Sequence, residues 1–159
     1  MDFSPIINAP FSVQVHVVFA ITSLVLVPFI LFGRKGDRRH KMLGRIWVAA
    51  MALTAISSFA IMDIRLIGPF SPIHGLSILT LYSLFGAVRE ARAGRVEAHK
   101  RHILGAMGGL LGAGVFTVLP GRLMSDVLFG QAQLLGFVFV LVLGAAGFVL
   151  WRAKLRHAI

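Results

Sequence analysis

The chain has 159 residues, about the length of one domain. Hydrophobic residues make up 57% of it and charged residues only 14%, and its mean hydropathy is +0.86. A soluble domain carries roughly 25% charged residues with which to cover its surface, so this composition excludes an ordinary soluble protein. The absence of cysteine excludes disulfides, thiolate metal sites and thiol nucleophiles.

The net charge of +10 is concentrated in three segments. Six Lys and Arg lie in residues 34–45, five in 89–101 and three in 152–156, and only Arg65 and Arg122 lie elsewhere. Apolar runs separate these clusters, which is the pattern of basic loops retained in the cytoplasm. We therefore predict an N-terminus outside, a C-terminus inside and a lipid bilayer as partner. No nucleic-acid partner is expected, because no aromatic-interleaved soluble domain accompanies the charge.

Five apolar runs are each long enough to cross a hydrocarbon core of about 30 Å, which takes ~20 helical residues. The fold class predicted is an all-α integral membrane protein of about five transmembrane helices. We expect a four-helix bundle core plus a fifth helix, in a single domain over residues 1–159. The five helices are expected over approximately 11–32, 43–62, 72–91, 99–119 and 134–151.

Individual residues predict where helices begin and end. Asp37 suits the N-cap of the second helix, Gly94 a break after the third, and the pair at 120–121, Pro-Gly, a stop after the fourth. Trp47 and Trp151 fall near the expected inner interface, where indole rings prefer to lie.

The acidic residues all lie at predicted helix ends or in tails. Carriers of ions or protons usually hold an ionisable group near the membrane midplane. The position of the acidic residues therefore counts against an ion-coupled transporter. The six are Asp2, Asp37, Asp63, Glu90, Glu97 and Asp126.

Two histidines form a predicted outer pair. His16 lies inside the outer end of the first predicted helix, and His74 lies in the first turn of the third. Two helices that each place one imidazole at equal depth meet the requirement of bis-histidine haem ligation. We predict haem b here, with His16 and His74 as axial ligands. The only outer cations, Arg65 and Arg122, would lie within reach of the haem propionates.

The inner rim carries a second set of histidines. His40 opens the second predicted helix, and His99 and His102 lie one turn apart on one face of the fourth. His40 with His99 or His102 is a candidate inner haem site. The same three residues would also suit zinc or copper, which bind imidazole nitrogen.

Each histidine also has an interpretation without any cofactor. The rim histidines lie among Lys and Arg, as interfacial residues do. His16 and His74 could satisfy their nitrogens on each other, on Gln14, on Asp63 or on a helix-end carbonyl.

The fourth predicted helix is rich in glycine, in two overlapping small-xxx-small patterns. Such glycines let membrane helices pack closely, either within the bundle or against a membrane-protein partner. They would equally leave a flat wall for a porphyrin or a quinone. The residues are Gly105, Gly108, Gly109, Gly112 and Gly114.

Three stretches together resemble a known family: HKMLGRIWVAAMALTAISSFAI from His40, GPFSPIHGLSILTLYSL from Gly68, and HKRHILGAMGGLLGAGVFTVLPGRLM from His99. Their motifs HxxLGR, GPFSPIH and LPGR, in this order and spacing, are similar to those of domain-of-unknown-function family 2306, a bacterial family of predicted membrane proteins. The resemblance covers most of the chain up to the outer end of the fourth predicted helix. It implies a helical bundle in a bacterial inner (plasma) membrane, with His16, His40, His74 and His99 as family-type positions.

The function expected is that of a b-type cytochrome-like electron-transfer protein, by analogy with transmembrane dihaem b cytochromes. One alternative is a non-catalytic accessory or assembly subunit of a larger membrane complex, which would need no cofactor. Another is a metal-handling membrane protein that uses the inner histidines.

Overall fold

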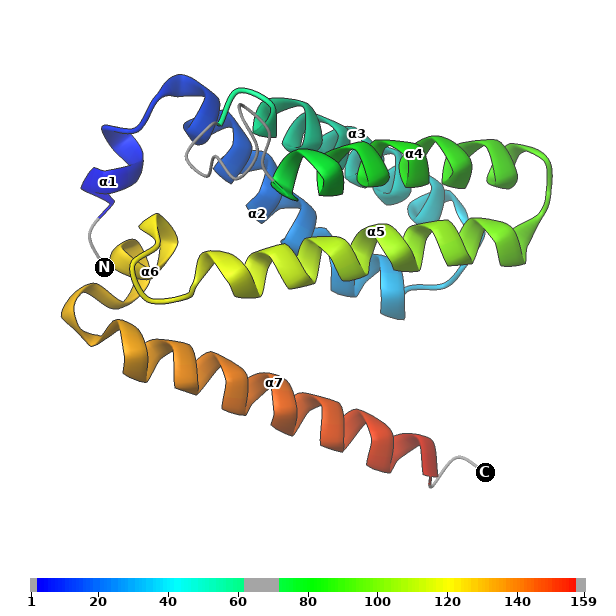
Figure 1. The fold of residues 1–159 in the computed structure, drawn as a ribbon. Helices are drawn as coiled ribbons and strands as arrows, with labels where there is room; N and C mark the ends of the chain where they lie inside the picture. Colours follow the sequence, from blue (N-terminus) through cyan, green and yellow to red (C-terminus); the bar gives the residue numbers. More distant parts are fainter. Residues whose placement is uncertain (1–2, 62–71, 157–159) are drawn as a thin grey trace. The chain divides into compact units, whose positions relative to one another are not determined.

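The structure is a computed structural model, and it describes residues 3–61 and 72–156 (Figure 1). Every regular element in these residues is helical and none is a strand, so the all-α class is confirmed. The elements are α1 (Ser4–Ile7), α2 (Phe11–Phe32), α3 (Arg38–Ser58), α4 (Pro72–Arg92), α5 (Val96–Thr117), α6 (Leu123–Phe129), the 3₁₀ helix η1 (Gly130–Ala132) and α7 (Gln133–Arg156).

The chain divides into two compact units. The larger comprises residues 9–113, with α2, α3, α4 and most of α5. The smaller comprises residues 1–8 and 114–159, in which α1 packs against α6 and α6 against α7. The single domain over residues 1–159 stays a prediction.

Local sequence signals begin and end the helices where we expected. The Asp37 carboxylate accepts a hydrogen bond of 2.7 Å from the backbone N–H of His40, as an N-cap does. Gly94 has φ +73° between α4 and α5, and Gly121 has φ +81° after α5. Both are left-handed conformations that glycine adopts without a steric cost.

Helix α3 starts at Arg38, directly after its predicted N-cap Asp37, and it ends at Ser58, before the expected end near residue 62. The short helix α6 was not predicted; it occupies part of the connection that was expected between the fourth and fifth helices.

The core of the larger unit draws on all four of its helices. Trp47 at its centre has no exposed surface, and its indole N–H donates to the Ser23 carbonyl at 3.1 Å. Core side chains enclose its ring. The prediction that Trp47 lies near the inner interface of the membrane concerns its depth and stays a prediction. The buried members are Val27, Ile30, Trp47, Met51, Leu84, Ala106, Met107 and Leu110.

Small hydroxyl side chains lie inside the larger unit, whereas large apolar side chains cover its outside. The buried set contains Ser23, Thr54, Ser58, Ser77 and Thr80. Exposed side chains include Val18, Ile21, Val25, Phe29, Ile56, Ile78, Leu79 and Phe85. An apolar exterior of this extent is typical of a surface that faces lipid or a partner rather than water.

Length and composition qualify two helical segments of the described residues as membrane spans. They are Phe11–Phe32 and Leu123–Val142. Helices α3, α4 and α5 have 21 or 22 residues, so they reach about 30 Å at ~1.5 Å per residue. Basic residues lie in the first turn of α3 and the last turn of α4, and α5 carries Lys100 and Arg101 in its second turn.

We expect Trp47→Ala to destabilise the protein by about 3–5 kcal/mol, because the change removes the bond to Ser23 and leaves a cavity in the core. Thermal unfolding of the full chain in detergent measures the change. Phe32→Ala is the matched control, because Phe32 is 79% exposed. Equal destabilisation by the two changes would contradict the central place of Trp47.

Candidate functional site

His16 of α2 is held by the neighbouring helix α3. Its Nδ1 lies 2.9 Å from the Thr54 carbonyl oxygen and 3.3 Å from the Ser57 hydroxyl. A carbonyl only accepts, so the bond to Thr54 requires a proton on Nδ1. In a neutral ring, Nε2 then carries the lone pair. Within the described residues, no hydrogen bond reaches Nε2 of His16.

His74 of α4 lies against the same end of α3. Its ring stacks on Phe59, with centroids 5.5 Å apart and planes 17° apart, and the residue is only 5% exposed. The hydroxyls of Ser58 and Ser77 lie 2.5 Å apart and join α3 to α4 one turn further along α4. The last turn of α3 and its C-cap residue Phe59 therefore contact both members of the predicted outer pair.

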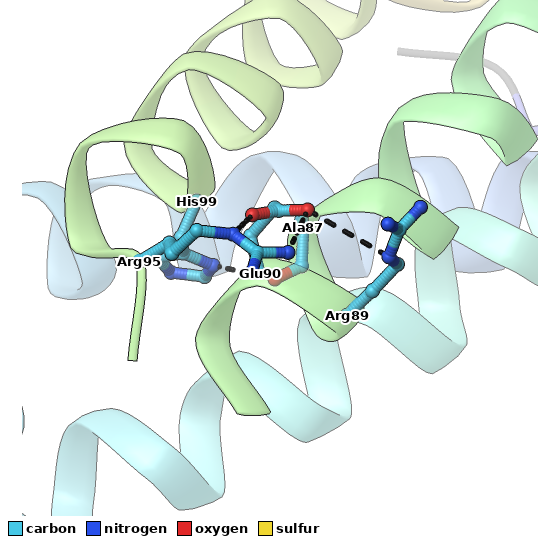
Figure 2. Close-up of polar contacts among 5 residues, drawn as sticks. All are labelled: Ala87, Arg89, Glu90, Arg95 and His99. Atoms are coloured by element: carbon cyan, nitrogen blue, oxygen red, sulfur yellow. Dashed lines mark hydrogen bonds and ion pairs between the residues drawn. The ribbon is translucent and has the colours of Figure 1, made fainter. Parts of the chain in front are cut away.

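At the opposite end of the larger unit, α4 and α5 are joined by a set of polar contacts (Figure 2). His99 Nδ1 lies 2.8 Å from the Ala87 carbonyl, so this nitrogen also carries the proton. Arg95 donates to the Glu90 carboxylate from Nη2 at 2.9 Å and also from Nε. Arg89 approaches the other side of Glu90, with Nε 3.8 Å from Oε1.

His40 lies in the first turn of α3, where its backbone N–H donates to the Asp37 carboxylate. The Nδ1 atom of His40 is buried and has no hydrogen-bond partner. A buried polar atom without a partner costs free energy, and such an atom is often found where a ligand or water completes the site.

His102 has different surroundings from the other two rim histidines. Its ring lies over Gly86 of α4, where an added Cβ would be 2.5 Å from Cε1. The ring also meets Tyr82 edge-on, with centroids 6.0 Å apart. We conclude that His102 packs α5 against α4.

The predicted metal site gains no support from these positions. In residues 3–61 and 72–156, no group of three or more His, Asp or Glu side chains is placed to hold a metal ion. His99 is tied to a carbonyl and the His102 ring packs on a glycine, so these two rings have different partners.

Of the two predicted outer cations, only Arg122 is among the described residues. It belongs to the smaller unit, where its guanidinium lies 4.6 Å from the centroid of the Phe116 ring. Arg65 lies outside the described residues, as do Asp63 and His157.

The smaller unit contains a polar cluster that we did not predict. Gln133 accepts from the backbone N–H of Gly121 at 2.6 Å and donates to Asp126. Gln133 and Asp126, with Pro5 and Pro120, line an open depression of about 550 Å³. A glutamine next to an apolar run carries no periodic signal, so nothing in the sequence pointed to it.

The glycines of α5 divide between a packed and an open surface. A Cβ at Gly109 would lie 3.3 Å from Leu76 of α4, so this glycine serves close packing. A Cβ at Gly105, Gly108 or Gly112 would meet no atom of the described chain within 4 Å.

We expect Gly86→Ala to destabilise the protein by about 1–3 kcal/mol, because the new methyl group would displace the His102 ring. The matched control is Gly44→Ala, where nothing lies within 4 Å and a helical alanine should be neutral or stabilising. Thermal unfolding compares the two. In a double-mutant cycle, His102→Ala should relieve most of the Gly86→Ala effect, and strict additivity would refute the contact.

Comparison with known proteins gives one family. The family model described as "Predicted membrane protein (DUF2306)" matches residues 13–146. No curated protein and no solved structure matches the chain.

Proposed function

The chain belongs to this family of predicted membrane proteins, and on that premise we propose that it crosses a bacterial inner membrane with about five helices. The spans would be α2, α3, α4, α5 and α7, with the N-terminus outside. The apolar exterior of the larger unit supports this arrangement, as does the clustering of 14 of the 16 basic residues in three segments.

For its function, we propose a haem-binding electron-transfer protein of b type. The observation that carries the proposal is the bond between His16 Nδ1 and the Thr54 carbonyl at 2.9 Å. Histidines that ligate a metal usually donate their second ring N–H to a carbonyl or a carboxylate, which fixes the ring and directs the other nitrogen to the metal. His16 has this arrangement, with Nε2 unengaged in the described chain.

The second axial ligand of this outer site would be His74. Its ring is nearly buried and its plane is fixed by Phe59, so little side-chain entropy remains to be lost on ligation. Together the two imidazoles contact the last turn of α3 and its C-cap residue Phe59. A haem bound there would supply one-electron redox chemistry, and the chain would supply two fixed nitrogens and an apolar surrounding.

An inner site would use His40 and His99. The bond from His99 Nδ1 to Ala87 repeats the arrangement seen at His16. We choose His99 over His102 because the His102 ring is engaged by Gly86 and Tyr82. Two sites on opposite ends of the four helices would allow electrons to cross the membrane.

We expect His16→Ala to remove the outer haem. The reduced-minus-oxidised absorption spectrum of protein purified from haem-replete cells measures the bound haem. Wild type should show a b-type spectrum. The variant should keep only the absorbance of the haem bound at the inner site. Added imidazole should restore part of the loss, because it can occupy the space of the missing ring.

His102→Ala is the matched control for this experiment, since it removes a histidine that packs rather than binds. It should leave the spectrum unchanged. A wild-type preparation without haem would contradict the proposal. Full retention of haem in His16→Ala would contradict the assignment of His16 as a ligand.

A second candidate function is that of an accessory subunit in a larger membrane complex. The observation in its favour is the open surface of α5 at Gly105, Gly108 and Gly112, where close approach of another helix is unobstructed. Here Gly108→Leu should release the chain from a partner during native gel electrophoresis of solubilised membranes. The control, Leu104→Ala, alters a side chain that is already 57% exposed. Migration of wild type as a lone chain would exclude this function.

A further inference from the structure

Two turns at one end of the larger unit concentrate positive charge. One joins α2 to α3 and the other joins α4 to α5, the latter at the right of Figure 1. Both turns lie at the same end of the larger unit, because α3 begins where α4 ends (Figure 1). We define the basic rim as the exposed cations of this end that have no carboxylate partner: Arg34, Arg38, Arg39, Lys41, Arg45, Arg92 and Arg101.

The acidic residues of this end are already engaged. Asp37 caps α3, Glu90 pairs with Arg95 and Arg89, and Glu97 pairs with Lys100 at 2.6 Å. Within the described chain, no further carboxylate reaches the basic rim. Lys35 is outside the set as well, because its Nζ donates to the Ile30 carbonyl at 2.6 Å and to that of Leu31. In residues 3–61 and 72–156, the rim therefore has no carboxylate within ion-pair distance.

Large apolar side chains adjoin the rim. Phe32 is 79% exposed and lies two residues before Arg34, and Met42, 53% exposed, follows Lys41 directly. Ile46 follows Arg45, and Leu104 lies one turn beyond Arg101. A ligand that binds both the basic rim and the adjoining apolar side chains carries an anionic head group and apolar chains. An acidic protein or a nucleic acid would meet the charges and leave the apolar side chains uncovered.

We propose that the basic rim is a binding site for anionic phospholipid, with the phosphate groups on Arg38, Arg39 and Lys41 and the acyl chains along the adjoining apolar side chains. The first turn of α3 also contributes its positive helix end, which favours a phosphate. The site lies at the opposite end of the larger unit from His16 and His74, whereas His40 of the proposed inner site lies between Arg39 and Lys41. Bound lipid is counted directly, so the test can be made whether or not the protein binds haem.

The test uses the full-length protein, delipidated in a non-ionic detergent and titrated with phosphatidylglycerol or phosphatidylcholine. Native mass spectrometry counts the bound lipid. Each cation near an anionic lipid surface contributes a factor of about five in affinity. The triple change Arg38→Gln, Arg39→Gln and Lys41→Gln should therefore weaken phosphatidylglycerol binding about one hundredfold. Phosphatidylcholine binding should hardly change.

Two variants separate charge from folding. Arg38→Lys with Arg39→Lys keeps the charge and should keep most of the binding, and Arg122→Gln removes a cation of the smaller unit and should have no effect. Equal binding of the two lipids by wild type would overturn the proposal, as would full binding by the triple variant. Displacement of phosphatidylglycerol by a glutamate-rich peptide of equal charge would overturn it in favour of an acidic protein partner.

Discussion

The hydrogen bonds that α3 makes with its two neighbours organise the larger unit. In an apolar surrounding, each polar group needs a partner from the chain, because no water competes for it. Helix α3 meets this need on both sides. The indole of Trp47 bonds to α2 and the Thr54 carbonyl accepts from His16, while the Ser58 hydroxyl meets Ser77 of α4. These contacts set the rotation of α3 between the two helices.

The same constraint determines which histidines can act as ligands. His16 and His99 each use one ring nitrogen on a backbone carbonyl of the next helix, at 2.9 Å and 2.8 Å. A ring held in this way has a fixed tautomer and a fixed plane. His102 instead fills the space over Gly86, so we assign its ring to packing and not to ligand binding. The contacts of a histidine with neighbouring helices therefore indicate its role better than its presence in the sequence does.

Sequence reasoning worked where the cause was local. The N-cap at Asp37 and the glycines with positive φ at 94 and 121 act over a few residues, so their effect was visible in the chain itself. It did not show that the core encloses the ring of Trp47, because the side chains that cover this ring come from other helices. It also missed Gln133, whose partners Gly121 and Asp126 lie seven to twelve residues away.

Composition and charge clustering depend on no particular packing, so the helical class and the membrane environment could be predicted from the chain alone. The occurrence of histidines near both ends of the predicted bundle could be predicted in the same way. How each histidine is used depends on the packing of the helices. The carbonyls of Thr54 and Ala87 come from neighbouring helices 38 and 12 residues away, and the ring of Phe59 and the space over Gly86 come from neighbouring helices as well. Such partners meet only when the helices pack.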